Sequence, residues 1–194
     1  MAALRWRACA NPYADEHPEL DRPGAAAIRC ANLRHYLDER AGARVLLVGE
    51  AIGYRGGRFS GMAFTSERLL AGWGPPYAPS STHAAGWAEP SSTIIHGLLA
   101  DHDAERDAVL WNVVPAHPHR PGSPLSNRAP TVAEVAQGAP VLDAVIALLQ
   151  PRTVVAVGRI AERLLGGRAH AAVRHPAQGG ATACREGLAR VLDR

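Results

Sequence analysis

The chain has 194 residues, of which 47% are hydrophobic and 20% charged, and this composition excludes a disordered protein and favours one domain over residues 1–194. Its 21 basic residues exceed its 18 acidic ones, for a formal net charge of +3, and every basic residue is arginine, which excludes catalysis through a lysine Schiff base. The sequence has no unbroken apolar run of about 18 residues and no apolar segment near Met1, so we expect a cytoplasmic protein that does not contact a membrane.

The N-terminal part of the chain is expected to contain one helix and one strand. Residues 1–22 are rich in Pro, Asp and Glu and predict an irregular segment. Residues 23–41 predict a helix, because apolar side chains recur on one face and a glycine follows. The apolar run at residues 44–48 predicts a buried parallel strand, and the many glycines of residues 49–61 predict a loop.

The middle of the chain is expected to contain a second helix and a second strand. Residues 72–92 are polar and rich in Pro and Ser, which predicts a loop, and Ser92 is placed to cap a helix that carries the apolar residues of 94–99. The acidic run at residues 101–107 predicts a solvated surface. Residues 108–114 are apolar and predict a buried strand.

The next segment predicts a further helix with a defined beginning and end. Thr131 and Glu134 have the spacing of a capping box, in which each side chain bonds the backbone amide of the other residue. Apolar residues from Val132 to Leu149 follow at helical spacing, and Pro151 marks the end of the helix.

The C-terminal part alternates strands and helices. Residues 153–157 predict a strand, and a helix that ends at residue 165 follows it. Residues 169–173 predict another strand, and a helix over residues 182–192 follows that one. Strands that alternate with helices at this spacing predict an α/β fold. We expect a three-layer α/β/α sandwich with a central four-stranded parallel sheet.

Four residues with chemical use lie at the carboxyl ends of the four predicted strands. These residues are Glu50, Asn112, Gly158 and His175. In open α/β sheets, ligands bind outside the carboxyl ends of the strands. We therefore expect these four residues to lie side by side at one edge of the sheet, where they would form a binding site.

The charges of the loops at this edge point to an anionic partner. Residues 51–66, 108–133 and 163–185 contain arginines and no acidic residue, so Glu50 is the acid expected nearest to the edge. A positive rim of this kind suits a nucleotide or a nucleic acid. The alternative is a chance clustering of charges in loops.

Several short segments, in order along the chain, resemble the motifs of one enzyme superfamily. Residues 48–53 read Val-Gly-Glu-Ala-Ile-Gly and residues 61–64 read Gly-Met-Ala-Phe. They are similar to the G-E-A-P-G and G-x-P-F patterns of family 4 of the uracil-DNA glycosylase superfamily. The matches that follow are Trp-Asn-Val-Val at 111–114, Val-Gly-Arg-Ile-Ala at 157–161 with Leu-Leu-Gly at 164–166, and Arg-His-Pro-Ala at 174–177.

The resemblance spans about residues 44–190 and implies the fold and the activity of this superfamily. The implied activity is that of a monofunctional DNA glycosylase in base excision repair, which flips a base out of the helix and hydrolyses its N-glycosidic bond. As this bond breaks, the sugar gains positive charge and the base negative charge. The site must therefore stabilise both charges and position a water molecule.

The resemblance implies catalytic roles for Glu50 and His175. The carboxylate of Glu50 would order or deprotonate the water and stabilise the cationic sugar. An imidazole N–H of His175 would stabilise the anion at O2 of the departing base. The structural alternatives are that Glu50 accepts backbone N–H bonds of the glycine-rich loop and that His175 hydrogen-bonds within its own loop.

Base recognition is implied for Asn112 and Phe64. The amide of Asn112 offers one donor and one acceptor, which match O4 and N3–H of uracil but not the pattern of cytosine. Its alternative role is to tie a strand end to a loop. Phe64 would stack on the base, or else pack in the core. The backbone is expected to approach the base at Gly49, Ala51, Ile52 and Gly53.

Contacts with the DNA strand are implied for residues that flank these motifs. The expected phosphate-binding residues are Ser66, Gly158, Arg159 and Arg174. Gln178 lies where the loop of the family inserts a wedge into the duplex.

The chain departs from family 4 at positions that concern metal binding. Ala116 stands where family 4 has a cluster-ligating cysteine, and the chain has no N-terminal C-x-x-C. The four-cysteine iron–sulfur site is therefore missing, and we expect no metal and no cofactor. Two motif prolines are replaced by Ile52 and Ala63. His117 is interpreted as a loop-packing or phosphate-contacting residue rather than a nucleophile.

The expected partner is DNA that contains uracil or another deaminated base. Members of the superfamily differ in the base that they remove, so hypoxanthine and xanthine remain alternatives to uracil. Two other classes are a non-catalytic protein that binds abasic or damaged DNA and a flavodoxin-like nucleotide-binding module. The chain has no lysine and therefore lacks the G-x-x-x-x-G-K-[ST] loop of a nucleotide-binding module. Nothing in the sequence indicates an obligate oligomer, so we expect a monomer.

Overall fold

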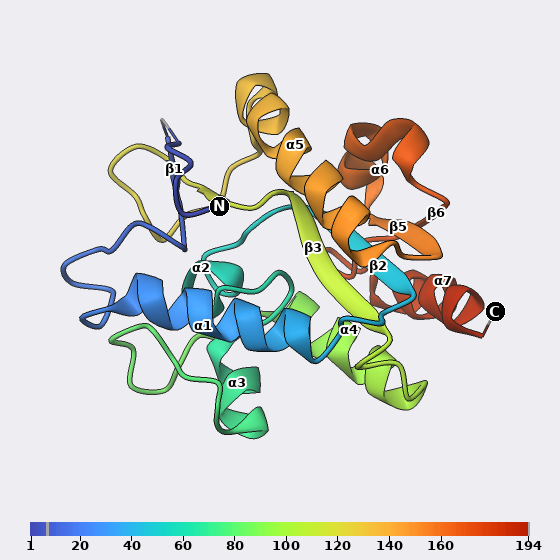
Figure 1. The fold of residues 1–194 in the computed structure, drawn as a ribbon, viewed down its shortest axis with the longest axis horizontal. Helices are drawn as coiled ribbons and strands as arrows, with labels where there is room; N and C mark the ends of the chain where they lie inside the picture. The colour runs from blue at the N-terminus through green and yellow to red at the C-terminus, as the bar shows by residue number, and fades with distance from the viewer. Residues whose placement is uncertain (7, 194) are drawn as a thin grey trace.

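The central sheet is parallel throughout and has helices on both faces (Figure 1). The computed structural model describes residues 1–6 and 8–193. Within these residues the sheet has four strands in the order β3-β2-β5-β6. They are β2 (Val45–Ala51), β3 (Ala108–Val114), β5 (Thr153–Val157) and β6 (Ala171–Val173). The predicted α/β fold with a four-stranded parallel sheet is confirmed.

The helices form an outer layer on each side of the sheet. Helices α5 (Val132–Leu149) and α6 (Arg159–Leu165) lie over one face (Figure 1). Helices α4 (Pro90–Asp101) and α7 (Ala181–Leu192) contact each other over the opposite face. This arrangement leaves the carboxyl ends of the strands uncovered, which is where the motif residues lie.

Helix α1 protects an edge of the sheet. It spans Ala25–Asp38 and lies beside the edge strand β3, where Leu110 N donates a hydrogen bond to Tyr36 Oη at 2.9 Å. Tyr36 is 1% exposed. A buried hydroxyl therefore satisfies a backbone amide of the edge strand that would otherwise lack a partner.

Strand β2 continues further than its apolar run predicts. Its ladder with β3 extends through Gly49, which lies opposite Asn112. Glu50 therefore stands on the strand itself rather than in a loop over residues 49–61. The pairing with a neighbouring strand, which a single segment does not reveal, accounts for this difference.

Helix α4 begins before the predicted cap. The residue at the N-cap position is Glu89, and Pro90 occupies the first turn, where its missing N–H costs nothing. Ser92 is instead a buried residue within the helix, and its Oγ accepts a hydrogen bond from Ser66 N at 3.1 Å. The prediction that Ser92 caps this helix is wrong.

Three short helices lie in segments that the sequence predicts as loops or for which it predicts no helix or strand. They are α2 (Gly57–Ser60), α3 (Glu67–Trp73) and the 3₁₀ turn η1 (Gly166–Arg168). Their shortness explains the omission, because three to seven residues are too few to show a helical period.

The N-terminal segment is irregular, as predicted, but it is firmly attached to the rest of the domain. Strand β1 (Cys9–Ala10) pairs antiparallel with β4 (His117–Pro118). The buried Asp21 binds Arg29 at 3.1 Å and Arg58 at 2.8 Å. Two guanidinium groups on one carboxylate hold this segment against α1 and α2.

The predicted capping box at the start of α5 is confirmed. Glu134 N donates to Thr131 Oγ1 at 3.3 Å, and Thr131 N donates to Glu134 Oε2 at 2.8 Å. Further along, Gly138 faces the backbone carbonyl of Val113 so closely that a Cβ would collide with it. This glycine therefore allows α5 to lie directly on β3.

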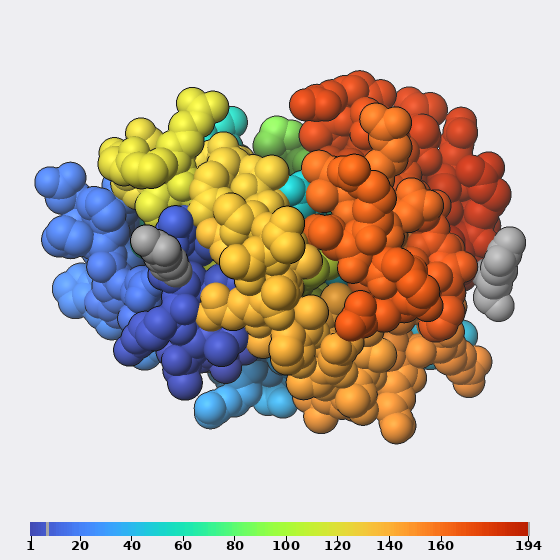
Figure 2. Space-filling view, turned by 90° about the horizontal axis from the view of Figure 1, so that it is seen from above, coloured from blue at the N-terminus to red at the C-terminus, as the bar shows by residue number. Residues whose placement is uncertain are grey.

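Helix α5 bears on the expectation that the protein does not contact a membrane. By length and composition alone, and within the residues that the structure describes, Val132–Leu149 is long and apolar enough to cross a membrane, with a mean hydropathy of 1.6. Seen from above, it runs across the surface between the N-terminal segment and α6 (Figure 2). Val132 is 88% exposed and Leu148 75% exposed, so these two apolar residues are not core positions.

Candidate active site

A cavity of about 600 Å³ opens at the carboxyl ends of the parallel strands, within the size range of small-molecule sites. It lies between the loop before α5, yellow in Figure 2, and the loop before α7, red in Figure 2. Its lining includes Glu50, Asn112, Gly158 and His175. The structure therefore brings together the four residues that the sequence placed at the strand ends.

Most of the other predicted site residues also line this cavity. They are Ala51, Ile52, Gly53, Phe64, Arg159, Arg174 and Gln178. Gly49 and Ser66 are the exceptions, because both are absent from the lining, and Ser66 is only 2% exposed. Ser66 occupies the N-cap position of α3, a helix that the sequence does not predict, and its burial argues against the expected DNA contact.

The floor of the cavity depends on Gly49. A Cβ at this position would lie 2.5 Å from Asn112 Oδ1 and 2.5 Å from Phe64 Cζ, distances that no side chain tolerates. Asn112 and Phe64 thus converge on the space that Gly49 leaves free. Phe64 has a left-handed backbone with φ of 48°, a conformation that costs energy in a non-glycine residue and is often found at functional sites.

In the described part of the chain, the buried Oε1 atom of Glu50 has no hydrogen-bond partner. Oε1 therefore accepts none of the hydrogen bonds from loop amides that the alternative role of Glu50 requires. Burial raises the pKa of Glu50, and the positive charge of Arg163 opposes that shift. A half-buried carboxyl with a free oxygen in a cavity is suited to bind water or a cation-like sugar.

His175 has a defined hydrogen-bonding pattern. Its Nδ1 lies 3.1 Å from Ala177 N and accepts that amide hydrogen, so the neutral ring carries its proton on Nε2. Burial and the charge of Arg174 lower the pKa of His175, which favours the neutral ring. His175 thus forms the hydrogen bond within its own loop that the alternative role predicts. This bond uses only Nδ1 and leaves Nε2–H as a donor.

The position of the His175 ring depends on Gly158. This glycine has φ of 94°, and a Cβ there would lie 3.0 Å from His175 Cβ. On its other side the ring is 5.9 Å from the ring of Phe64. His175 is therefore held between the end of β5 and the aromatic floor of the cavity.

Asn112 is 4% exposed and lines the cavity from β3. Among the side-chain hydrogen bonds of the described residues, none ties its amide to a loop, as the structural alternative would require. The amide thus keeps its donor and acceptor available to a ligand.

Among the lining residues that were not assigned to the site from the sequence, five are polar: Arg55, Glu89, Ser91, Asn127 and Arg128. Glu89 places a second acid at this edge, beside Glu50, which the acid-free loops did not indicate. Asn127 has a structural task, because its Oδ1 accepts a hydrogen bond from Tyr54 N at 3.1 Å. The polar loop and the helix start that carry these residues gave no periodic signal.

The positive rim is smaller than the sequence predicted. Arg58 is buried against Asp21, Arg128 binds Glu134 at 2.6 Å and Arg168 binds Asp143 at 2.7 Å. These three ion pairs neutralise arginines that lie in acid-free segments. The arginines that line the cavity and remain exposed at its mouth are Arg55, Arg159 and Arg174.

His117 serves packing, as interpreted from the sequence. It is fully buried, and its two ring nitrogens lie 3.0 Å from the carbonyl of Ile52 and 3.1 Å from that of Pro124. It therefore links the loop after β2 to the loop before α5, and it is absent from the cavity lining.

Comparisons with known proteins agree with this geometry. The family model described as the uracil DNA glycosylase superfamily matches residues 37–190. The crystal structure of wild-type SMUG2 from Pedobacter heparinus is similar, with a TM-score of 0.67 and 16% identity, over 98% of this chain and 91% of that chain. No curated protein sequence matches the chain.

The fold and the cavity define a glycosylase that acts on DNA. A carboxylate, an amide, an imidazole and a phenylalanine ring line one cavity at the carboxyl ends of a parallel sheet, and these groups are suited to the extraction and hydrolysis of a base. Because the family model covers most of its length, the chain belongs to the uracil DNA glycosylase superfamily.

Proposed function

We propose that this protein removes uracil from DNA by hydrolysis and leaves an abasic site. One observation supports this most strongly: the unpartnered Glu50 oxygen, the Asn112 amide and the Nε2–H of His175 surround one cavity above Phe64. We also propose that the protein acts as a monomer in the cytoplasm. The chain has no lysine, so the reaction stops after hydrolysis and no strand cleavage through a lysine Schiff base follows.

Recognition begins when the flipped base enters the cavity and stacks on Phe64. The NH₂ group of Asn112 donates to O4 of uracil, and its carbonyl oxygen accepts from N3–H. Cytosine presents an amino donor and a bare ring nitrogen at the same places, so both contacts become repulsive. Gly49 makes this recognition possible, because any side chain there would displace Asn112 and Phe64.

Hydrolysis follows from the charges that the site offers. As the C1′–N1 bond breaks, its electron pair moves to the base, and Nε2–H of His175 stabilises the anion at O2. The Glu50 carboxylate stabilises the cationic sugar and takes a proton from the water whose oxygen forms the new bond to C1′. The released base later takes up a proton from solvent.

The DNA strand is held at the mouth of the cavity. Arg159 and Arg174 are exposed there and bind phosphates on either side of the flipped nucleotide. Gln178 has φ of 54° in the tight turn before α7, and its side chain occupies the space that the base leaves in the duplex. The first backbone amides of α6, which follow Gly158, add a further phosphate contact.

The experiment that tests this function uses labelled oligonucleotides with one uracil, hypoxanthine or xanthine, each single- and double-stranded. Treatment with protein and then alkali is expected to cut the uracil strands only, and Glu50→Gln is expected to lose this activity by at least about 10²-fold. Cutting only at hypoxanthine or xanthine would contradict the role of Asn112. Retained DNA binding without any cutting would identify a binding protein instead.

A further inference from the structure

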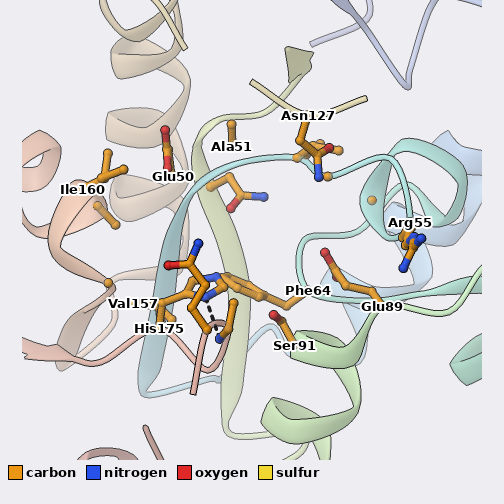
Figure 3. Close-up of a pocket in the computed structure, with 18 of the residues that line it drawn as sticks. Glu50, Ala51, Arg55, Phe64, Glu89, Ser91, Asn127, Val157, Ile160 and His175 are labelled. Atoms are coloured by element: carbon orange, nitrogen blue, oxygen red, sulfur yellow. Dashed lines mark hydrogen bonds between the residues drawn. The ribbon is translucent and has the colours of Figure 1, made fainter. Parts of the chain in front are cut away.

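The segment that carries Phe64 has an uncommon backbone conformation. Phe64 has φ of 48°, in the left-handed region that costs energy for a residue with a side chain. Figure 3 shows its ring between His175 and the start of α4, where Ser91 lies. Such a conformation persists only where the surrounding structure fixes it. The groups that fix the backbone of Phe64 therefore also fix the position of its ring in the cavity.

The residue after Phe64 forms a hydrogen bond across it. Thr65 is fully buried, and its Oγ1 donates to the carbonyl of Ala63 at 3.0 Å. One hydroxyl therefore closes a short ring around the backbone of Phe64. Ser60 holds the same segment, because its Oγ donates to the carbonyl of Thr65 at 2.7 Å and accepts from Met62 N at 3.0 Å.

Helix α4 supplies a partner for the hydroxyl of Thr65. His96 is 9% exposed, and its Nε2 lies 3.1 Å from Thr65 Oγ1. The hydroxyl hydrogen already points to Ala63, so both contacts are hydrogen bonds only when Nε2 carries a proton and donates it to Oγ1. Burial, together with the charge of Arg40, lowers the pKa of His96 to about 4. The ring is therefore neutral near pH 7, with its one proton on Nε2.

This network reaches the stacking ring without touching a base. Thr65 and His96 are both absent from the cavity lining, so they act on a base only through Phe64. The hydrogen bond from Ser66 N to Ser92 Oγ is a second link between the same two segments. A buried network whose members all have partners specifies one arrangement of the residues that it holds.

We infer that Thr65 and His96 are positioning residues, which hold the ring of Phe64 against the flipped base. The inference rests on the proposed function, in which Phe64 stacks on that base. The hydroxyl of Thr65 fixes the backbone of Phe64, and the imidazole of His96 fixes the hydroxyl. Without the hydroxyl, Phe64 relaxes toward a common backbone conformation, and its ring leaves the plane in which it stacks.

The test is a double-mutant cycle between Thr65 and Phe64, measured as single-turnover rates of uracil excision. Thr65→Val removes the hydroxyl and is expected to slow excision by about tenfold or more, because a small displacement of a positioning group is costly. Thr65→Ser is expected to restore most of the rate, since its hydroxyl has the same partners. In a Phe64→Leu background, Thr65→Val is expected to change the rate by less than about twofold, because no ring remains to be positioned.

Variants of His96 test the second half of the network. His96→Gln keeps an N–H that donates to Thr65 Oγ1, so it is expected to retain more of the rate than His96→Leu. The exposed Thr93→Val, on the same helix, is the matched control and keeps the rate of the wild type. If Thr65→Val does not fold, His96→Leu takes its place in the cycle.

The Phe64→Leu background separates positioning from a general effect on folding, which would slow excision in both backgrounds. Equal slowing in both backgrounds, or a wild-type rate in Thr65→Val, would overturn the inference. Uracil excision by the wild type tests the proposed function independently. If the wild type excises no uracil, the cycle is measured as the affinity for uracil on a hydrolysis-resistant 2′-fluoroarabinose relative to a tetrahydrofuran abasic site. Equal losses of this relative affinity in both backgrounds again overturn the inference.

Discussion

Gly49 and Asn112 lie opposite each other in the ladder of β2 and β3, and a Cβ on Gly49 would stand 2.5 Å from the Asn112 side-chain oxygen. The same Cβ would stand 2.5 Å from the ring of Phe64. One backbone position therefore limits where Asn112 and Phe64 can lie, the two side chains to which we assign recognition and stacking of the base. This relationship explains why the residue opposite Asn112 is a glycine.

Gly49→Ala is expected to lower uracil excision by more than tenfold, because the added methyl group displaces Asn112 and Phe64 from the base. Overpacking of this kind also costs about 1–3 kcal/mol of stability. Gly97→Ala is the matched control, since a Cβ at Gly97 in α4 meets no atom within 4 Å. The measurements are single-turnover rates and thermal melting. Full activity in a folded Gly49→Ala variant would contradict the described floor.

Asn112→Asp is expected to weaken the preference for uracil over cytosine. The carboxylate accepts hydrogen bonds but does not donate, so it repels O4 of uracil and matches the amino group of cytosine. The measurement is the ratio of single-turnover rates on uracil and cytosine oligonucleotides. An unchanged ratio would show that another residue reads this edge of the base.

His175→Ala is expected to slow excision about 10²-fold or more, because the lost Nε2–H stabilises charge that appears only in the transition state. DNA affinity should change much less, since the phosphate contacts come from arginines. His102→Ala, at the far end of α4, is the control. Rates and affinities are measured on the same oligonucleotide, and equal losses in both quantities would refute this assignment.

Glu89 is expected to make the fold sensitive to pH. Burial raises its pKa from the ordinary value of 4.5 to about 7 in the folded protein, so the charged form disfavours the native state. Relative to Glu89→Gln, the wild type should lose stability as the pH rises from about 4.5 to about 7, with no further loss above that. The full loss is about 3 kcal/mol.

The corresponding measurement is urea unfolding of both proteins at pH 5 and pH 8. The difference in the free energy of unfolding between Glu89→Gln and the wild type should grow toward pH 8. The exposed Glu186→Gln provides the surface control. A difference that does not vary with pH would show that burial does not raise the pKa of Glu89.

The strands and the strand-end residues could be predicted from the sequence because their signals are local. Short, mostly apolar runs define β3 and β5, and parallel strands bring their carboxyl ends to one edge of the sheet. Glu50, Asn112 and His175 therefore meet as expected. The resemblance of short motifs added the stacking role of Phe64, which no periodicity indicates.

The features that could not be predicted depend on contacts between distant segments. The acids that neutralise Arg58, Arg128 and Arg168 lie outside the acid-free segments that contain these arginines. Ser66 is buried because it begins a short helix that leaves no sequence signal. Glu89 precedes a Pro-Ser pair that indicates only the start of a helix, and its entry into the cavity is visible only in the folded chain.

The most direct test of the proposed function is the single-turnover rate of uracil release from a duplex by the wild type, Glu50→Gln and the exposed control Glu186→Gln. The amide of Gln neither takes a proton from water nor stabilises a cationic sugar as a carboxylate does. We predict free uracil and an intact, alkali-labile strand from the wild type and the control, with a rate at least about 10²-fold lower for Glu50→Gln. Equal rates for Glu50→Gln and the wild type, or no uracil release by a folded wild type, would contradict the account.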